Sequence, residues 1–281
     1  MDPLVIALVL AAAVMHAIWN AVIKLGEDRL MIMAVVIGMG AVLSPALLLS
    51  GPPPLPESWR FIALSVALHC VYFFFLIQAY RVGDLSHAYP LARGSAPLLV
   101  AAGAALFAGE TLNTLELLAV ALVSAGIVSL LFAGGYGLSG GWRVIVYPLA
   151  TGVMIAAYTV ADGLGVRLSG NPAAYIGWLF LLSAIPIGLF ALHRRRGAAL
   201  VFLREKWKPS VGGGLLAFTA YALAIWALSL GAMAHVSALR ETSVVIAALI
   251  GTRFLGEPFG RRRLLSATAV AAGVVLLTAA A

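Results

Sequence analysis

The sequence predicts an all-α membrane protein of ten transmembrane helices, built as two inverted five-helix repeats. Three observations predict it: an apolar composition, ten apolar segments of near membrane-spanning length, and an internal duplication. Of the 281 residues, 63% are hydrophobic and 10% are charged, and the mean hydropathy is +1.05. A soluble domain usually carries about 25% charged residues. This chain has too little polar surface for a soluble domain, so we expect a single transmembrane domain.

The apolar segments give the expected helices in order. About 20 apolar residues in a helix cross the roughly 30 Å of hydrocarbon in a bilayer. Glycine, proline and charged residues separate the segments, which are Pro3–Ile23, Leu30–Leu49, Trp59–Tyr80, His87–Ala108, Leu115–Phe132, Trp142–Gly163, Ala173–Leu192, Gly212–Leu230, Val236–Phe254 and Leu264–Thr278. We expect residues 1–133 to form the first repeat, 134–141 a linker and 142–281 the second repeat.

The two halves share residues at constant spacing. At a spacing of 147 the matching sets are Arg93, Ser95, Phe107, Gly109 and Glu110 with Arg240, Thr242, Phe254, Gly256 and Glu257. A shared intramembrane arginine and a shared Gly-Glu pair are hard to obtain by chance in so apolar a chain. Five spans per repeat is an odd number, so the second repeat must insert upside down relative to the first. Secondary transporters use this plan and place the substrate site at the repeat interface.

The basic residues predict an orientation in a bacterial inner membrane. Fourteen lysines and arginines lie on one side of the predicted spans, whereas only Arg60 and Arg167 lie on the other. Basic loops stay in the cytoplasm, so the count places both termini in the periplasm and the loop His193–Ser210 in the cytoplasm. These residues cluster in short loops rather than along a solvated face, which argues against a nucleic-acid partner.

Ionisable groups inside the spans are the candidate functional residues. Each costs at least about 2.5 to 3.5 kcal/mol to insert, so each suggests a partner or a task. Arg93 and Arg240 lie at similar depth in spans that start from opposite faces, so we expect one nearer each opening. A guanidinium is suited to bind a carboxylate or phosphonate. The alternative is that the arginines snorkel or bond backbone carbonyls.

Two carboxylates need separate interpretations. Glu241 follows Arg240 directly, and its equivalent in the first repeat is Gly94. Glu241 is expected to meet a substrate amino group or a proton, or else to form a fixed salt bridge with Arg93. Asp162 is predicted near the end of the sixth span, where an interfacial or capping role is expected.

Polar and aromatic residues accompany the charges. His16 and Asn20 are four residues apart and share one face of the first helix, with Trp19 beside them. Tyr158 occupies the place of Trp19 in the sixth span, and Tyr89 lies one turn before the first arginine. We expect these five residues to shape the substrate cavity, although His16, Trp19 and Asn20 could instead bond to one another and to a neighbouring helix. Further candidates are Tyr72, Gln78, Trp178, Tyr221 and Trp226.

Catalytic and metal-binding motifs are absent from the sequence. It contains no HExxH, no P-loop and no cluster of Cys and His at metal-ligand spacing. We therefore expect neither an enzyme nor a cofactor or metal site. Without an ATP site, uphill transport would have to use an ion gradient, and protons are the coupling ion considered.

These motifs together resemble the drug/metabolite transporter superfamily, in particular its ten-helix EamA-type members. Gly109–Glu110 and Gly256–Glu257 end the fourth span of each repeat, and Pro97 is similar to the family's helix-breaking proline, which Val244 replaces in the second repeat. The resemblance implies a basket of helices around a central cavity, peripheral fifth and tenth spans, and amino-acid export by alternating access. It also implies cytoplasmic termini, opposite to the orientation that the basic-residue count predicts. Small multidrug-resistance relatives carry a glutamate in the first span, where this chain offers His16.

Three functional hypotheses follow. The first is a transporter, monomeric or homodimeric, that exports a small zwitterion or anion such as an amino acid. In this hypothesis, Arg93 and Arg240 bind the acidic group of the substrate in alternating conformational states of the transporter. The second is a carrier of phosphorylated or phosphonate compounds. The third is a non-transporting membrane component, such as a lipid-flipping or regulatory subunit.

Overall fold

The computed structural model is helical throughout nearly all of the chain that it describes. That part comprises residues 1–281 except 25–28, 83–84, 130–140, 195–197 and 255–260. Within the helices, the side chains of residues 20–24, 29–30, 32–33, 80, 85–87, 191–192, 194, 198–210, 248, 251–254 and 261–263 are also left undescribed.

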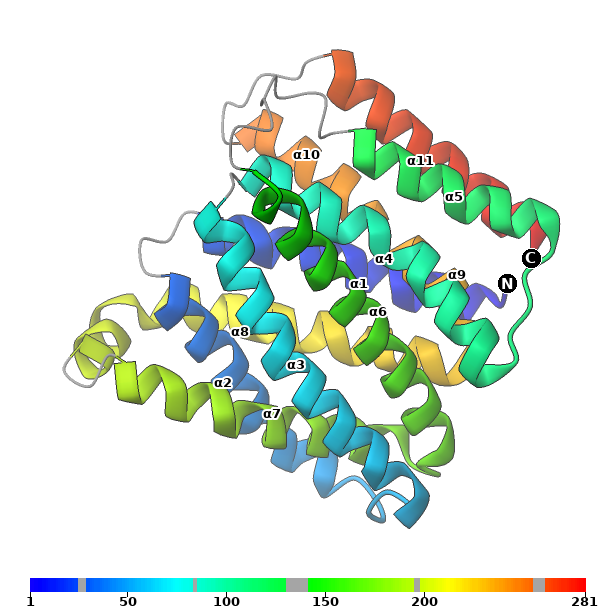
Figure 1. The fold of residues 1–281 in the computed structure, drawn as a ribbon. Helices are drawn as coiled ribbons and strands as arrows, with labels where there is room; N and C mark the ends of the chain where they lie inside the picture. Colours follow the sequence, from blue (N-terminus) through cyan, green and yellow to red (C-terminus); the bar gives the residue numbers. More distant parts are fainter. Residues whose placement is uncertain (25–28, 83–84, 130–140, 195–197, 255–260) are drawn as a thin grey trace.

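Each repeat contributes five spans (Figure 1). The first repeat holds α1 (Pro3–Lys24), α2 (Arg29–Leu48), α3 (Pro56–Val82), α4 (Leu85–Ala108) and α5 (Thr114–Val128). The second holds α6 (Arg143–Leu168), α7 (Pro172–Arg194), α8 (Ala198–Leu230), α9 (Met233–Arg240), α10 (Thr242–Phe254) and α11 (Arg261–Ala280). Of these, α9 and α10 together form one span. Within the described residues, five helices are long and apolar enough to cross a membrane, and four further apolar helical segments are shorter. The predicted all-α membrane fold is confirmed.

The ninth span differs from its predicted form. A continuous helix over Val236–Phe254 was expected, but α9 ends at Arg240 and α10 begins at Thr242. Around the break, the Glu241 amide bonds the Ala238 carbonyl at 3.1 Å and the Val244 amide bonds the Glu241 carbonyl at 2.9 Å. These bonds join residues three apart, as in a tighter turn than the α-helix. Arg240, Glu241, Thr242 and Ser243 form a polar run at this interruption, but the apolar residues on both sides led to the prediction of one continuous span.

Two other boundaries differ from prediction. The sixth span continues past Gly163 to Leu168, and the eighth begins at Ala198 rather than Gly212. The predicted loop at 193–210 is therefore largely helical, since its Ala, Leu, Lys, Arg and Glu residues favour helix. Its charges locate a membrane edge but do not end the helix. The predicted linker at 134–141 lies outside the described residues except for Gly141.

The helix packing has approximate twofold equivalence. The contact of α1 with α8 across the repeats matches that of α6 with α3, and α4 packs on α6 as its equivalents α9 and α10 pack on α1. The pairs α2 with α7 and α5 with α11 each join a helix to its own equivalent. Figure 1 shows α5 and α11 at one edge of the bundle, with α2 and α7 towards the opposite edge. Every helix packs mainly against the other repeat, which supports the inverted-repeat interpretation.

The pair α5 and α11 depends on close backbone approach. A Cβ at Gly273 would lie 3.0 Å from both the Ala119 carbonyl oxygen and the Val123 amide nitrogen. A Cβ at Gly126 would lie 3.1 Å from the Val270 nitrogen. Gly126 and Gly273 are repeat equivalents, so the same glycine serves both sides of this contact. Small residues allow such approach between helices in lipid.

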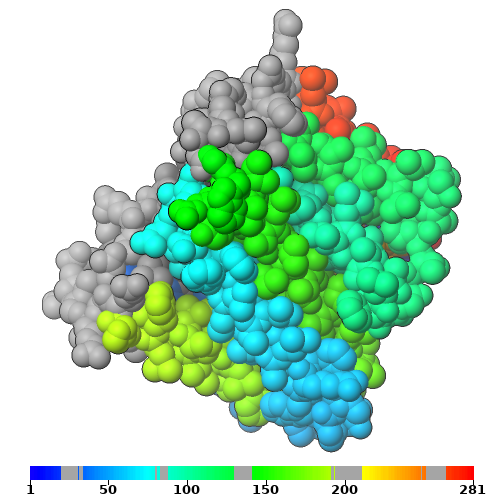
Figure 2. Space-filling model, viewed as in Figure 1, coloured from blue at the N-terminus to red at the C-terminus, as the bar shows by residue number. Residues whose placement is uncertain are grey.

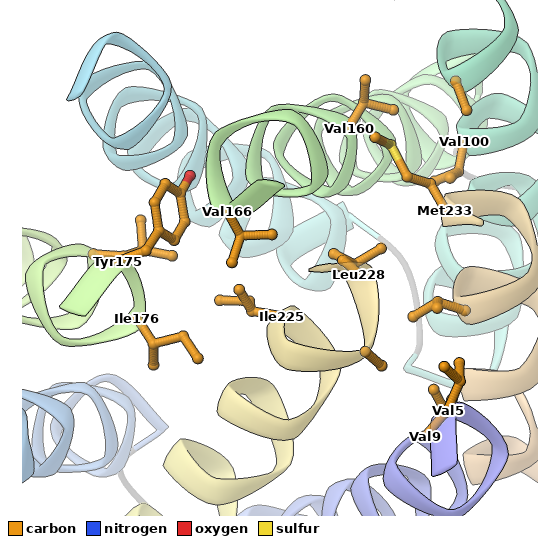
Figure 3. Packing of buried hydrophobic residues seen from close by; sticks show 14 of the residues in the cluster. Val5, Val9, Val100, Val160, Val166, Tyr175, Ile176, Ile225, Leu228 and Met233 are labelled. Atoms are coloured by element: carbon orange, nitrogen blue, oxygen red, sulfur yellow. The ribbon is translucent and has the colours of Figure 1, made fainter. Parts of the chain in front are cut away.

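An apolar core packs one end of the bundle. It gathers Val5 and Val9 of α1, Val166 of α6, Ile225 of α8 and Met233 of α9, among others. Figure 3 shows these side chains converging from helices of both repeats. On the outer face in Figure 2, α3, α6 and α7 lie next to one another and α5 covers the flank.

Hydrogen bonds between the repeats tie this same end together. The Leu55 amide donates to the Ser169 carbonyl at 2.9 Å, and the Asn171 side-chain amide donates to the Pro52 carbonyl at 2.8 Å. The end formed by the connections at 49–55, 109–113, 169–171 and 231–232 is hereafter the packed end. Its apolar core and cross-repeat bonds leave the two halves joined there.

Candidate functional site

An ion pair joins the repeats inside the bundle. The Arg93 guanidinium of α4 meets the Glu241 carboxylate through two contacts, Nε to Oε2 at 3.1 Å and Nη2 to Oε1 at 2.8 Å. Only 6% of Arg93 and 2% of Glu241 is exposed. The guanidinium fork matches the two carboxylate oxygens, so geometry as well as charge holds the pair. The structure therefore contains the salt bridge that was one of two roles expected for Glu241.

The position of Glu241 follows from the break in the ninth span. Glu241 is the single residue between α9 and α10, and its side chain turns towards α4. Its repeat equivalent, Gly94, cannot carry a similar side chain. A Cβ at Gly94 would lie 2.8 Å from Cγ2 of Val128 and 3.2 Å from the Ser124 carbonyl oxygen in α5. Packing of α5 on α4 therefore explains why the acidic group occurs in only one repeat.

Arg240 is the second buried cation of the site. Its guanidinium carbon lies 5.4 Å from the centroid of the Tyr221 ring, and 9% of the residue is exposed. No ion pair joins Arg240 to a carboxylate among the residues that the structure describes. Cation–π contact stabilises a buried guanidinium only in part. Arg240 thus keeps a positive charge that no direct anionic contact matches, whereas Glu241 matches Arg93.

The two arginine side chains lie at one buried polar centre. At about 1.5 Å per residue, Arg240 lies about 10 Å along α9 from the packed end and Arg93 about 22 Å back along α4. Their backbones are therefore at different depths, as predicted. Their side chains nevertheless converge, because both guanidinium groups interact electrostatically with Glu241 and with His16. In this conformation they share a single polar centre rather than two separate openings.

Aromatic rings form one wall of this centre. The His69 ring stacks on Tyr158 with centroids 4.1 Å apart and planes at 21°. Tyr72 and Tyr221 meet Tyr158 edge-on at 5.7 Å and 6.0 Å. We call His69, Tyr72, Tyr158 and Tyr221 the aromatic wall. Tyr158 interacts electrostatically with both arginines, so the wall faces the charged centre.

The predicted polar patch of α1 lies at the same centre. The Trp19 indole nitrogen donates to Nδ1 of His16 at 3.2 Å, and the rings meet at 87° with centroids 5.3 Å apart. Because both arginines act on His16, the structure brings His16 to the predicted site. Trp19 accompanies it through the indole hydrogen bond. The Asn20 side chain lies outside the described part of the chain.

Tyr89 completes the set expected from the sequence. It lies in α4, half-buried, and interacts electrostatically with Arg93, Glu241 and Arg240. It also packs against the apolar cluster that includes Ile127 and Val244. The structure therefore assembles all the described members of the predicted site around the charged centre.

The further candidates divide between the site and the membrane edges. Tyr72 and Tyr221 belong to the aromatic wall. Trp178 instead packs on Trp59 with centroids 5.1 Å apart, near the packed end. Trp226 is 48% exposed. Interfacial aromatic residues are common near span ends, so the two tryptophans fit that structural role better than a site role. The Gln78 side chain accepts a 3.4 Å hydrogen bond from exposed Arg81, and no described contact joins it to the charged centre.

The interfacial role expected for Asp162 is wrong. Asp162 is fully buried and accepts hydrogen bonds from the hydroxyl groups of Tyr221 at 2.6 Å and Tyr175 at 3.1 Å. The prediction failed because α6 continues to Leu168, which moves Asp162 inward. One signal was available in the sequence: Asp162 follows Tyr158 by four residues and so shares its helix face.

The Gly-Glu motif of the first repeat has a structural role at the packed end. Gly109 has φ of +66°, a conformation that glycine adopts without strain, and it ends α4. Glu110 then accepts from the Met233 amide at the start of α9 at 2.8 Å and pairs with Arg167 at 2.7 Å. A carboxylate stabilises a helix N-terminus. The corresponding Gly256 and Glu257 lie outside the described residues.

No group of three His, Cys, Asp or Glu side chains in the described part of the chain is arranged to hold a metal ion. The charged centre is instead made of one paired arginine, one arginine without a carboxylate contact, and aromatic hydroxyl and imidazole groups. Guanidinium groups of this kind are suited to contact carboxylates and phosphates.

A ten-span bundle of two inverted repeats, with charges buried where the repeats meet, defines the class as a polytopic membrane transporter. The chain belongs to the EamA-like transporter family, which it matches over residues 3–132 and 142–279. It is thus a multi-pass member of the drug/metabolite transporter superfamily, whose EamA members are transporters rather than enzymes. No curated protein matches the chain.

The fold also matches solved structures. Twenty-nine chains of solved structures match. One of them, a crystal structure of a protein, superposes with a TM-score of 0.76 at 17% sequence identity. The match covers 98% of this chain and 96% of that one. At this identity the similarity establishes the fold alone, and the substrate must be argued from the site.

Proposed function

We propose that this transporter moves a small zwitterionic or anionic metabolite, such as an amino acid, outwards across a bacterial inner membrane. The observation that carries the proposal is the state of Arg240. It is 9% exposed and has no carboxylate contact among the described residues. An isolated charge inside a membrane is costly, and a substrate carboxylate placed on Arg240 would supply the missing anion through a forked contact.

The neighbouring groups fit the rest of such a substrate. Glu241 already shares its carboxylate with Arg93 and acts on Arg240, so a substrate amine beside Arg240 would meet a negative group. The half-buried rings of Tyr72 and Tyr221 offer an apolar surface with hydroxyl groups for its side chain. Small-molecule sites commonly combine apolar walls with a few placed polar groups.

Alternating access is supported by the twofold packing and by the packed end. Apolar core and cross-repeat hydrogen bonds join the halves at one end. The inverted repeats can exchange conformations, which would open this end and close the other. With the basic-residue count as the guide to orientation, the packed end is periplasmic and the conformation is closed to the outside.

The test begins with a thermal-shift screen of amino acids, organic acids and phosphate esters on the purified protein. The best stabilising compound is then used in proteoliposome flux with wild type, Arg240→Gln and Arg93→Gln. We expect flux to fall at least tenfold in both. Arg143→Gln is the matched control, because Arg143 is exposed and lies 5.7 Å from the Trp142 ring. Unchanged flux in both site variants refutes the proposal, and stabilisation by phosphate esters alone favours a phosphorylated substrate instead.

A further inference from the structure

A second polar cluster adjoins the aromatic wall, and the carboxylate at its centre is not used by the proposed substrate contacts. Its centre is Asp162 of α6, which is 0% exposed. The hydroxyl groups of Tyr221 and Tyr175 donate to its two oxygens, at 2.6 Å to Oδ2 and 3.1 Å to Oδ1. No ion pair joins Asp162 to a basic side chain among the described residues. Hydrogen-bond donors therefore take the place of a direct counter-ion.

The imidazole of His69 is the nearby basic group. Its Nδ1 lies 2.8 Å from the Ser65 carbonyl oxygen. A carbonyl only accepts, so Nδ1 carries the hydrogen and Nε2 is left as the basic nitrogen. His69 interacts electrostatically with Asp162. His69 and Ser65 come from the first repeat and Asp162 from the second, so the cluster spans the interface that moves in alternating access.

The surroundings of Asp162 can be named helix by helix. The helices packed on α6 present four polar groups to Asp162: His69 and Ser65 of α3, Tyr175 of α7 and Tyr221 of α8. Tyr158 lies on α6 itself. Arg93 of α4 and Arg240 of α9 interact electrostatically with Tyr158. Arg240 also acts electrostatically on His69, and Tyr221 contacts Arg240 through its ring and Asp162 through its hydroxyl group. Within this set the carboxylate and the imidazole have the lowest unperturbed pKa values, so they are the two candidates for proton exchange.

We propose that Asp162, with His69 beside it, binds the coupling proton of transport, an inference that rests on the proposed function. In one conformation a proton from the aqueous phase adds to a carboxylate oxygen of Asp162 and forms an O–H bond. In the other conformation that bond breaks and the proton leaves to water on the opposite side. The neutral acid suits the buried site. The two tyrosine hydroxyls hold the anion after the proton leaves.

Tyr221 connects the proton site to the substrate site. Its hydroxyl donates to Asp162, while its ring lies against the Arg240 guanidinium at 5.4 Å. Protonation replaces a charged acceptor by a neutral one and weakens the hydroxyl bond. The ring is then freer to shift against Arg240, so occupancy of one site affects the other. This is a coupling between two sites through one side chain.

Infrared difference spectroscopy of the purified protein without substrate tests the proton site directly. As pH is lowered, wild type should gain a protonated-carboxyl band that Asp162→Asn lacks entirely. Glu57→Gln, which removes an exposed carboxyl in the first turn of α3, should retain the band. Tyr221→Phe keeps the carboxyl and should shift the band's frequency through loss of one hydrogen bond. A wild-type spectrum without an Asp162-dependent band overturns the proposal, as does a band that responds to sodium instead of pH.

A flux measurement separates this proposal from the proposed function. Proteoliposomes containing a pH-sensitive dye are given the best compound from the thermal-shift screen. Wild type should move protons with that compound, and Asp162→Asn should lose the proton movement. Substrate flux without proton movement in wild type refutes proton coupling but leaves transport intact. Absence of flux for every compound, with the infrared band present, refutes the transport proposal and leaves Asp162 as a proton-binding group.

Discussion

Removing the carboxylate charge of Glu241 tests the ion pair on which the site depends. Glu241→Gln keeps the side-chain volume but leaves Arg93 buried without its anion. The two contacts are 3.1 Å and 2.8 Å, and the two residues are 2% and 6% exposed. Breaking such a buried pair by removing one partner costs about 3 to 5 kcal/mol. We expect the free energy of unfolding to fall by about that amount.

The assay is a double-mutant cycle on the purified protein in detergent, followed by unfolding with denaturant. Arg93→Gln should destabilise comparably, because it strands the Glu241 carboxylate. The double variant should lose much less than the sum of the singles, since neither charge is then left unpaired. Arg81→Gln, at an exposed position, serves as the control and should change stability by less than about 0.5 kcal/mol. Additive losses, or single variants as stable as wild type, would refute a buried pair.

Three further outcomes are expected in unfolding measurements. Gly273→Ala should destabilise by about 1 to 3 kcal/mol, because its Cβ would press on the α5 backbone at 3.0 Å, whereas Gly188→Ala, with nothing within 4 Å, should not destabilise. Glu110→Gln should cost about 1 to 2 kcal/mol through its ion pair and its bond to the first amide of α9, while Glu57→Gln stays neutral. Asn113→Ala should cost about 1 kcal/mol by removing the capping box of α5. An unchanged midpoint of denaturant unfolding in any of these three variants would contradict the contact on which its prediction rests.

The sequence predicted the spans well because the bilayer imposes a local rule. Backbone groups in hydrocarbon must bond within their own segment, so long apolar segments become helices. The matching spacing of Arg93 and Arg240 also predicted the twofold arrangement, and the packing of Gly126 on α11 and Gly273 on α5 agrees with it. These are properties of single segments or of their repetition.

The helix interiors were less predictable. The break at Glu241 lies in the polar run Arg240–Ser243, which was predicted to lie within one continuous span because apolar residues flank it. Asp162 was misplaced because Gly163, Gly165 and Arg167 follow it and resemble the end of a span, although α6 continues to Leu168. In both cases tertiary contacts override the local signal.

What the sequence determined by itself is the membrane class, the two repeats and the set of residues with buried charge or polarity, since each depends on composition or spacing. Only the tertiary structure decided the partners. Arg93 and Glu241 are 148 residues apart, and no local pattern shows which carboxylate meets which arginine. Packing of the two repeats pairs Arg93 with Glu241 and leaves Arg240 without a direct carboxylate contact among the described residues. The reason is that a buried charge is compensated by its neighbours in space rather than in sequence.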